Sequence, residues 1–193
     1  MSPVRLAAFS GSTREGSTNT KLVGAIAAIA SEMGADVNVI SLADHAAPLY
    51  DPELEAKSGI PESIKALQAI WTGSDAIFVA SPEYNGSVTP LLKNTIDWIS
   101  RVSIEGEERS LAFRKPVWSL GAVSPGSQGG VNSLYQLRPI VARLGAIVMP
   151  EQLTVGDGFS AFTDDGGFTN ERTTGLAQTQ VARLLDVAGK LKA

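Results

Sequence analysis

Runs of consecutive apolar residues alternate with helix-like spacing along this chain. Five runs have the length of a strand and carry few polar positions, as is typical of strands that are buried on both faces. They lie at residues 4–9, 37–42, 75–80, 117–123 and 146–149. Between them, apolar residues recur at steps of three and four, which predicts helices with one buried face. Five strands that alternate with five helices predict a parallel α/β sheet covered on both sides.

Local signals place the ends of some of these elements. Thr89 precedes Pro90, the order expected of an N-cap followed by the first turn of a helix. Pro61 opens another predicted helix, and the segment 43–59, with two prolines and a glycine, is predicted as a loop.

Ligands of such sheets bind beyond the carboxyl ends of the strands. We therefore expect the chemistry of this chain in the loops after the first, third and fourth strands.

Composition narrows the class of protein. The 193 residues, 44% of them apolar and without an internal repeat, predict a single domain over residues 1–193. Sixteen basic residues against twenty acidic ones argue against a nucleic-acid partner, because phosphate neutralisation requires a basic surplus. No apolar stretch is long enough to span a membrane, and the N-terminal run lacks the pattern of a signal peptide. We expect a cytoplasmic protein without a membrane partner.

The chemistry open to the chain is limited by two residue types. The sequence has no cysteine, which excludes disulfides, thiolate nucleophiles and cysteine-based metal sites. It has one histidine, His45, so a multi-histidine metal centre is excluded and no metal site is expected. A Ser-His-Asp hydrolase would have to use that histidine. A phosphate-ester hydrolase is disfavoured because no pair of nucleophile and base is evident.

The loop after the first strand, residues 10–20, is rich in glycine and hydroxyl side chains and includes Arg14. Glycine allows close backbone approach, and the following helix offers free N–H groups at its positive end. These features predict an anion site, with phosphate as the expected anion; the alternative is a polar loop without a ligand. The spacing of Gly11 and Gly16 is close to that of a nucleotide-triphosphatase loop, but Ser17 occupies the lysine position. The dinucleotide pattern G-x-G-x-x-G is absent.

Two further loops follow the third and fourth predicted strands. In the first of them, Asn85-Gly86 favours a tight turn with positive φ, and Tyr84 is suited to contact a flat ring. The alternative is a turn in which the tyrosine only packs. The other, residues 124–130, holds three glycines in seven positions, which permits close approach to a ligand or makes a flexible loop. The three loops together predict a ligand site more specifically than any one does.

These loops resemble the NADPH-dependent FMN reductase family of flavodoxin-like proteins, which includes flavin, quinone, azo and chromate reductases. The resemblance runs from about residue 4 to 155. It rests on Gly11-Ser12-Thr13-Arg14-(x)2-Ser17-(x)-Asn19, on Pro82-Glu83-Tyr84-Asn85-(x)-Ser87 through Leu92-Lys93-Asn94-(x)2-Asp97-Trp98, and on Ser124-Pro125-Gly126-(x)2-Gly129-Gly130. The stretch Gln136-Leu137-Arg138 and the strand ending in Met149-Pro150 also resemble the family.

The resemblance implies a doubly wound, five-stranded parallel sheet of order 2-1-3-4-5 and a role for each loop. The first loop would hold the phosphate of FMN, the second would border the isoalloxazine ring, and the third would line the other side of the ring. The residues implied are Ser12, Arg14, Ser17, Asn19 and Thr20 for the phosphate, Pro82, Glu83, Tyr84 and Asn85 for the ring, and Ser124 and Gly126 for its other side. It also implies a homodimer or homotetramer, with the helix over residues 91–101 at an interface.

The function expected on this basis is an FMN-dependent NAD(P)H oxidoreductase. Hydride would pass from NADPH or NADH through FMN to a flavin, a quinone or a similar small acceptor by a ping-pong mechanism. The cofactor carries the chemistry, so no side chain is assigned a catalytic role. The alternative is a flavodoxin-like electron carrier without reductase activity. Arg101, Arg109 and Arg114 are candidates for contact with a 2′-phosphate, and the choice between NADPH and NADH stays open.

Overall fold

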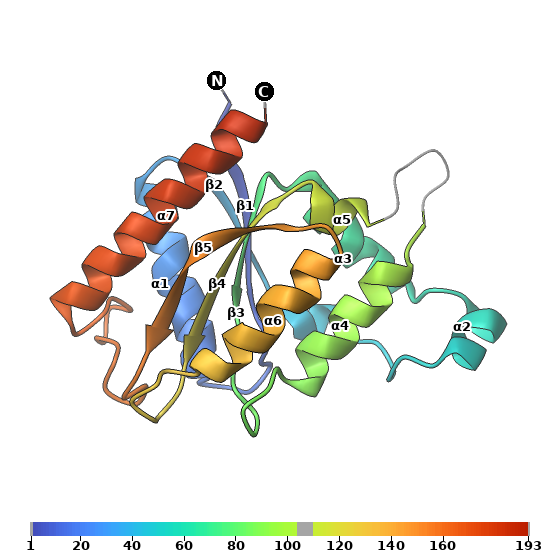
Figure 1. Ribbon diagram of the computed structural model, residues 1–193, viewed down its shortest axis with the longest axis horizontal. Helices are drawn as coiled ribbons and strands as arrows, with labels where there is room; N and C mark the ends of the chain where they lie inside the picture. Colours follow the sequence, from blue (N-terminus) through green and yellow to red (C-terminus); the bar gives the residue numbers. More distant parts are fainter. Residues whose placement is uncertain (1, 104–109, 193) are drawn as a thin grey trace.

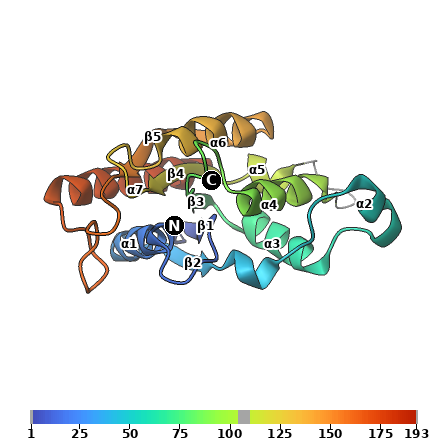
Figure 2. The same cartoon turned by 90° about the horizontal axis from the view of Figure 1, so that it is seen from below.

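The computed structural model describes residues 2–103 and 110–192, and it forms a parallel sheet between two layers of helices (Figures 1 and 2). The strand order β2-β1-β3-β4-β5, with every neighbouring pair parallel, confirms the predicted flavodoxin-like sheet. The strands are β1 (Arg5–Ser10), β2 (Asp36–Ile40), β3 (Ala76–Ala80), β4 (Val117–Val123) and β5 (Ile147–Val155).

Helices cover both faces of the sheet. They are α1 (Thr18–Glu32), α2 (Pro52–Ser58), α3 (Glu62–Gly73), α4 (Pro90–Arg101), α5 (Leu111–Arg114), α6 (Val131–Arg143) and α7 (Glu171–Leu191), with a 3-10 helix η1 (Leu42–His45). Helices α1 and α7 lie on one face, and α3, α4 and α6 lie on the other (Figure 2). Helix α2 stands away from the sheet, beyond α3 and α4, in both views.

The segment 43–59 was predicted as a loop, and this prediction was wrong: it contains α2 and most of η1. The carboxylate of Asp51 caps α2 by accepting hydrogen bonds from the backbone N–H groups of Glu53 and Leu54. Gly59, at φ 73°, ends the helix. Because no residue of α2 is fully buried and Leu54 alone packs against the core, the helix has no apolar face from which periodicity could have revealed it.

Strand β5 is longer than predicted and runs to Val155. Trp118 of β4 pairs with Val148, but Leu120 pairs with Gln152, so that three residues of β5 face one residue of β4. This bulge contains Pro150, which has no N–H for the ladder and is tolerated on an edge strand. Because of the irregular register and the proline, the sequence pattern did not predict the second half of β5.

The two layers have differently built cores. The side facing α3, α4 and α6 contains all three tryptophans, Trp71, Trp98 and Trp118, each fully buried. Trp71 stacks on Phe9 with 5.1 Å between ring centroids and meets Trp118 edge-on at 5.1 Å. The side facing α1 and α7 is filled mainly by aliphatic side chains. Aromatic packing therefore fixes one layer and aliphatic packing the other.

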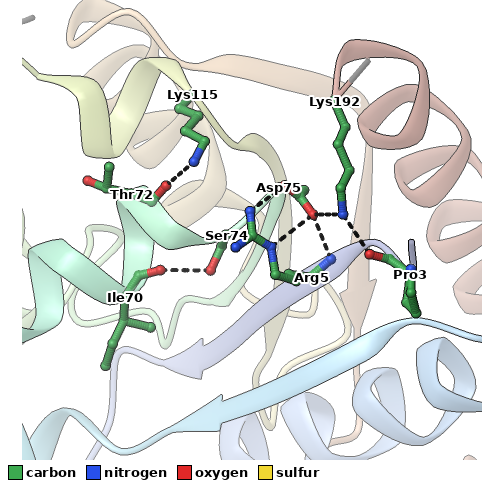
Figure 3. Close-up of polar contacts among 8 residues, drawn as sticks. All are labelled: Pro3, Arg5, Ile70, Thr72, Ser74, Asp75, Lys115 and Lys192. Carbon is green, nitrogen blue, oxygen red and sulfur yellow. Dashed lines mark hydrogen bonds and ion pairs between the residues drawn. The ribbon is translucent and has the colours of Figure 1, made fainter. Parts of the chain in front are cut away.

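A buried carboxylate joins three elements at the amino edge of the sheet (Figure 3). Asp75, whose side chain is 5% exposed, accepts hydrogen bonds from the backbone N–H of Arg5 at 2.9 Å, from Arg5 Nη2 at 3.0 Å and from Lys192 Nζ at 2.7 Å. Burial alone raises the pKa of Asp75, but the bonds from Arg5 and Lys192 outweigh it and hold this pKa well below its ordinary value. The carboxylate thus links β1, β3 and the end of α7.

Candidate functional site

Three loops meet at the carboxyl edge of the sheet because β1, β3 and β4 are neighbours (Figure 1). We call residues 11–17 the first loop, 81–89 the second loop and 124–130 the third loop. The hydroxyl of Thr89 donates to the carbonyl of Gly11 at 2.7 Å, which ties the second loop to the first. A Cβ atom on Gly11 would lie 3.1 Å from Leu92 Cβ and 3.2 Å from Pro82 Cδ. The absence of a side chain at Gly11 permits this close packing.

The N-terminus of α1, directly after the first loop, is not capped by a side chain. Ser17 occupies the N-cap position and makes no capping hydrogen bond. In contrast, Thr89 caps α4 and Asn170 caps α7 through their side chains. The first-turn N–H groups of α1, at the positive end of the helix dipole, are therefore available to an anion.

Residues of the first and second loops line one hollow of about 340 Å³. Ser12 and Arg14 contribute to it from the first loop, and Tyr84 contributes from the second. Arg14 is exposed and donates a hydrogen bond of 3.4 Å to the carbonyl of Glu15. Its guanidinium is not held by a carboxylate within the described part of the chain. The structure thus brings two of the predicted anion-binding side chains, Ser12 and Arg14, and the predicted aromatic contact to one place.

The remaining residues predicted for the phosphate lie elsewhere around α1. Thr20 lines a smaller hollow of about 200 Å³ between α1 and the end of β2, together with Ser10 and Ser12. Ser17, the last residue of the first loop, is buried. The side chain of Asn19 is also buried: its Nδ2 donates to the carbonyl of Val123 at 2.9 Å, and its Oδ1 accepts from the N–H of Val123 at 3.0 Å. The amide of Asn19 thereby joins α1 to β4.

The tip of the second loop is a two-residue turn. The backbone N–H of Tyr84 donates to the carbonyl of Ser87 at 2.9 Å, and the N–H of Ser87 donates back to Tyr84 at 3.0 Å. Asn85 and Gly86 have φ values of 52° and 76°, which confirms the predicted tight turn with positive φ. Tyr84 is 55% exposed, so its ring is presented at the surface beside the first loop.

The second loop is also bonded to α6, a connection that the sequence analysis missed. The carboxylate of Glu83 accepts from the backbone N–H of Ser133 at 3.1 Å and from Asn132 Nδ2 at 3.2 Å. Because the N-cap residue Gly130 has no side chain, Glu83 caps α6 from another loop. Nothing local in the sequence signals a contact between residues about fifty positions apart.

The third loop lies against β5 and leaves part of its backbone open. A Cβ atom on Gly129, at φ 62°, would lie 2.6 Å from the backbone nitrogen of Val155. At Gly126, in contrast, the nearest atom to an added Cβ is Ser124 Oγ at 3.9 Å. Gly126 and Ser124 stand at the same edge as the other two loops but do not line the hollow at Tyr84.

Two of the three arginines considered for a 2′-phosphate, Arg101 and Arg114, lie at the ends of α4 and α5, away from this edge. Arg101 ends α4 and pairs with Glu55, with 3.0 Å between Nε and Oε2. The bonds from Arg101 and from the Tyr50 hydroxyl lower the pKa of Glu55 from its ordinary value. Arg114 ends α5, where its side chain lies against Gly145. Arg109 lies outside the described residues.

Within the residues that the structure describes, each helix is too short or too polar to cross a bilayer.

Comparison with known proteins shows that the chain is similar to flavin enzymes. The family model described as NADPH-dependent FMN reductase matches residues 4–160. The quinone reductase of Escherichia coli K12 is 38% identical over 140 residues, which cover 72% of this chain and 70% of that protein. A probable NADPH:quinone oxidoreductase 2 from Oryza sativa subsp. japonica is 34% identical over 139 residues, covering 71% of this chain and 64% of the rice protein.

A solved structure has the same fold over nearly the whole length of the chain. FerB from Paracoccus denitrificans, described as a flavoenzyme NAD(P)H:(acceptor) oxidoreductase, is 27% identical with a TM-score of 0.79. The superposition covers 97% of this chain and 98% of FerB. All three loops fall within residues 4–160, which the family model matches.

Proposed function

Because the chain belongs to the NADPH-dependent FMN reductase family and is thus an NAD(P)H-dependent flavin oxidoreductase with FMN as cofactor, we propose that it reduces quinones or similar small acceptors. Bound FMN supplies the chemistry, hydride uptake from NAD(P)H and electron transfer to the acceptor. The protein contributes binding and orientation. The observation that carries the proposal is the hollow of about 340 Å³ in which Ser12 and Arg14 meet Tyr84.

The first loop and the start of α1 fit the phosphate of FMN. The first turn of α1 offers N–H groups without a side-chain cap, and Arg14 offers a positive charge next to them. Ser12, Ser17 and Thr20 would add hydroxyl donors. Asn19 would contribute its backbone N–H, because its side chain is bonded to Val123.

The second and third loops fit the borders of a flat ring. Tyr84 presents an exposed aromatic surface, and Pro82, Glu83 and Asn85 form the rest of the loop beside it. Ser124 and Gly126 would line the other side. Backbone N–H groups near Asn85 and Gly126 would stabilise negative charge on the ring. Contacts with α6 keep the second loop in place, so these groups need little rearrangement when the ligand binds.

We further propose a ping-pong order in which NAD(P)H and the acceptor occupy the open face of the site in turn. The resemblance to the family implies a homodimer or homotetramer with α4 at an interface. Helix α4 begins at the site with Pro90 and Leu91, which is compatible with an interface close to the flavin. A cytoplasmic location and small-molecule partners stay predictions of the same kind.

Anaerobic stopped-flow spectroscopy of the FMN-loaded protein tests the proposal. NADPH or NADH should bleach the visible flavin absorbance, and a quinone added afterwards should restore it. A protein that binds FMN but is not bleached by either nucleotide would be an electron carrier instead. Failure to bind FMN would refute the proposal as a whole. Arg14→Met should weaken FMN binding, whereas Arg172→Met, at an exposed position on α7, should leave it unchanged.

A further inference from the structure

Gln136 of α6 reaches across to the tip of the second loop. Its Nε2 donates to the carbonyl of Gly86 at 2.8 Å, and its Oε1 accepts from the hydroxyl of Ser87 at 2.6 Å. Both partners belong to the turn that carries Tyr84 and Asn85. Helix α6 begins beside this turn in Figure 1. One side chain therefore bonds two positions of a loop that is about fifty residues away in sequence.

The turn needs such support because it is small and exposed. Two backbone hydrogen bonds hold it together, and Asn85 adopts the left-handed region that residues with a Cβ occupy at a cost. An isolated turn of this kind has marginal stability in water. The amide of Gln136 offers one acceptor and two donors, which match the Ser87 hydroxyl and the Gly86 carbonyl. With Glu83 bonded to the start of α6, the second loop is held at its base and at its tip.

The bond to Gly86 also affects the charge that the turn presents. It engages the Gly86 carbonyl, the negative end of a peptide dipole, with α6. A carbonyl held in this way is not free to turn toward a ligand. The N–H groups of Asn85 and Gly86, which take no part in the two bonds across the turn, are then left to face the ring, and they favour a negatively charged ligand.

We propose that Gln136 is a positioning residue that sets the affinity and the redox potential of FMN through the 84–87 turn. The inference rests on the proposed function, since it requires FMN at this edge. Gln136 does not itself need to touch the cofactor. Gln136 acts by fixing the turn. Its removal should therefore weaken the binding of reduced FMN, which carries more negative charge, more than the binding of oxidised FMN.

The test compares Gln136→Met, which keeps the length of the side chain but neither hydrogen bond, with Gln178→Met, the same change at an exposed position of α7. Binding of oxidised FMN to the full-length chain and the midpoint potential of the bound flavin are measured, together with the melting temperature of the protein without FMN. Gln136→Met should bind oxidised FMN about threefold to tenfold more weakly, the range expected for a lost neutral hydrogen bond. If reduced FMN loses a further factor of about ten, the two-electron potential falls by about 30 mV.

A third variant separates the two bonds. Gln136→Glu keeps an acceptor for Ser87 but places a carboxylate against the Gly86 carbonyl, so it should lower the potential at least as much as Gln136→Met. The inference is overturned if Gln136→Met has the FMN affinity and potential of Gln178→Met, even where its melting temperature falls, because Gln136 would then be structural only. A wild-type chain that does not bind FMN would overturn both the inference and the proposed function.

Discussion

Replacing Asp75 with asparagine should destabilise the fold far more than a typical change of one charge. The carboxylate accepts four hydrogen bonds, at 2.9, 3.3 and 3.0 Å from Arg5 and at 2.7 Å from Lys192. Bonds to a charged group contribute about 1.5–3 kcal/mol each, but asparagine keeps one acceptor oxygen. Arg5 and Lys192, with 48% and 23% of their side chains exposed, recover part of their hydration. We therefore expect the free energy of unfolding to fall by about 2–3 kcal/mol.

Urea unfolding followed by far-UV circular dichroism at pH 7 measures this change. A loss of that size should lower the melting temperature by about 4–12 °C for a chain of this length. Asp186→Asn is the matched control: Asp186 pairs with Lys190 at 2.7 Å, but the two side chains are 58% and 72% exposed. The control should change the free energy of unfolding by less than about 0.5 kcal/mol. An Asp75→Asn protein as stable as the control would refute the reasoning.

The effect should also depend on pH in a defined direction. The pKa of Asp75 is lower in the folded protein than in the unfolded chain, so its ionisation stabilises the fold above the unfolded value of about 3.9. That stabilisation is lost as the pH falls from there toward the folded pKa. The difference in unfolding free energy between wild type and Asp75→Asn should therefore be constant from pH 7 to pH 5 and become smaller at pH 3.

Three further predictions concern the site and its supports. Arg14→Met should raise the dissociation constant for FMN by about ten- to a hundredfold, the loss of one charge-assisted contact, as measured by calorimetry; an unchanged constant would remove Arg14 from the phosphate site. Gly129→Ala should destabilise the protein by more than about 2 kcal/mol in urea unfolding, because the added Cβ meets the backbone of β5. Gly126→Ala, whose added Cβ would lie 3.9 Å from Ser124 Oγ, should leave the stability unchanged. Asn19→Ala should lower the free energy of unfolding by about 2–4 kcal/mol, since it leaves both backbone groups of Val123 without their partner. It should weaken the binding of FMN less than Arg14→Met does.

The elements that position the site could be predicted because their signals are local. Each strand before a loop is a run of apolar residues, and Thr89-Pro90 marks the start of α4 as a cap followed by proline. The Asn85-Gly86 turn follows from the residues that tolerate positive φ. In each case, the physical cause lies within a few residues of the element itself.

The remaining features depend on contacts between distant segments. Asn19 has a residue type suited to binding phosphate, but its side chain pairs with Val123 across more than a hundred positions. Glu83 and Gln136 find partners about fifty residues away, and no spacing rule relates them. Helix α2 was missed for a different reason: none of its residues is fully buried, so its sequence carries no apolar periodicity.

The uneven distribution of indole rings has a practical consequence. Trp71, Trp98 and Trp118 all lie between the sheet and α3, α4 and α6, and none of the three lies in the layer of α1 and α7. Intrinsic emission excited through these rings therefore reports on one half of the molecule only. If the layer holding α1, and with it the proposed phosphate site, unfolds first, tryptophan fluorescence will not detect that event. Following it requires a reporter introduced among the aliphatic side chains of that layer.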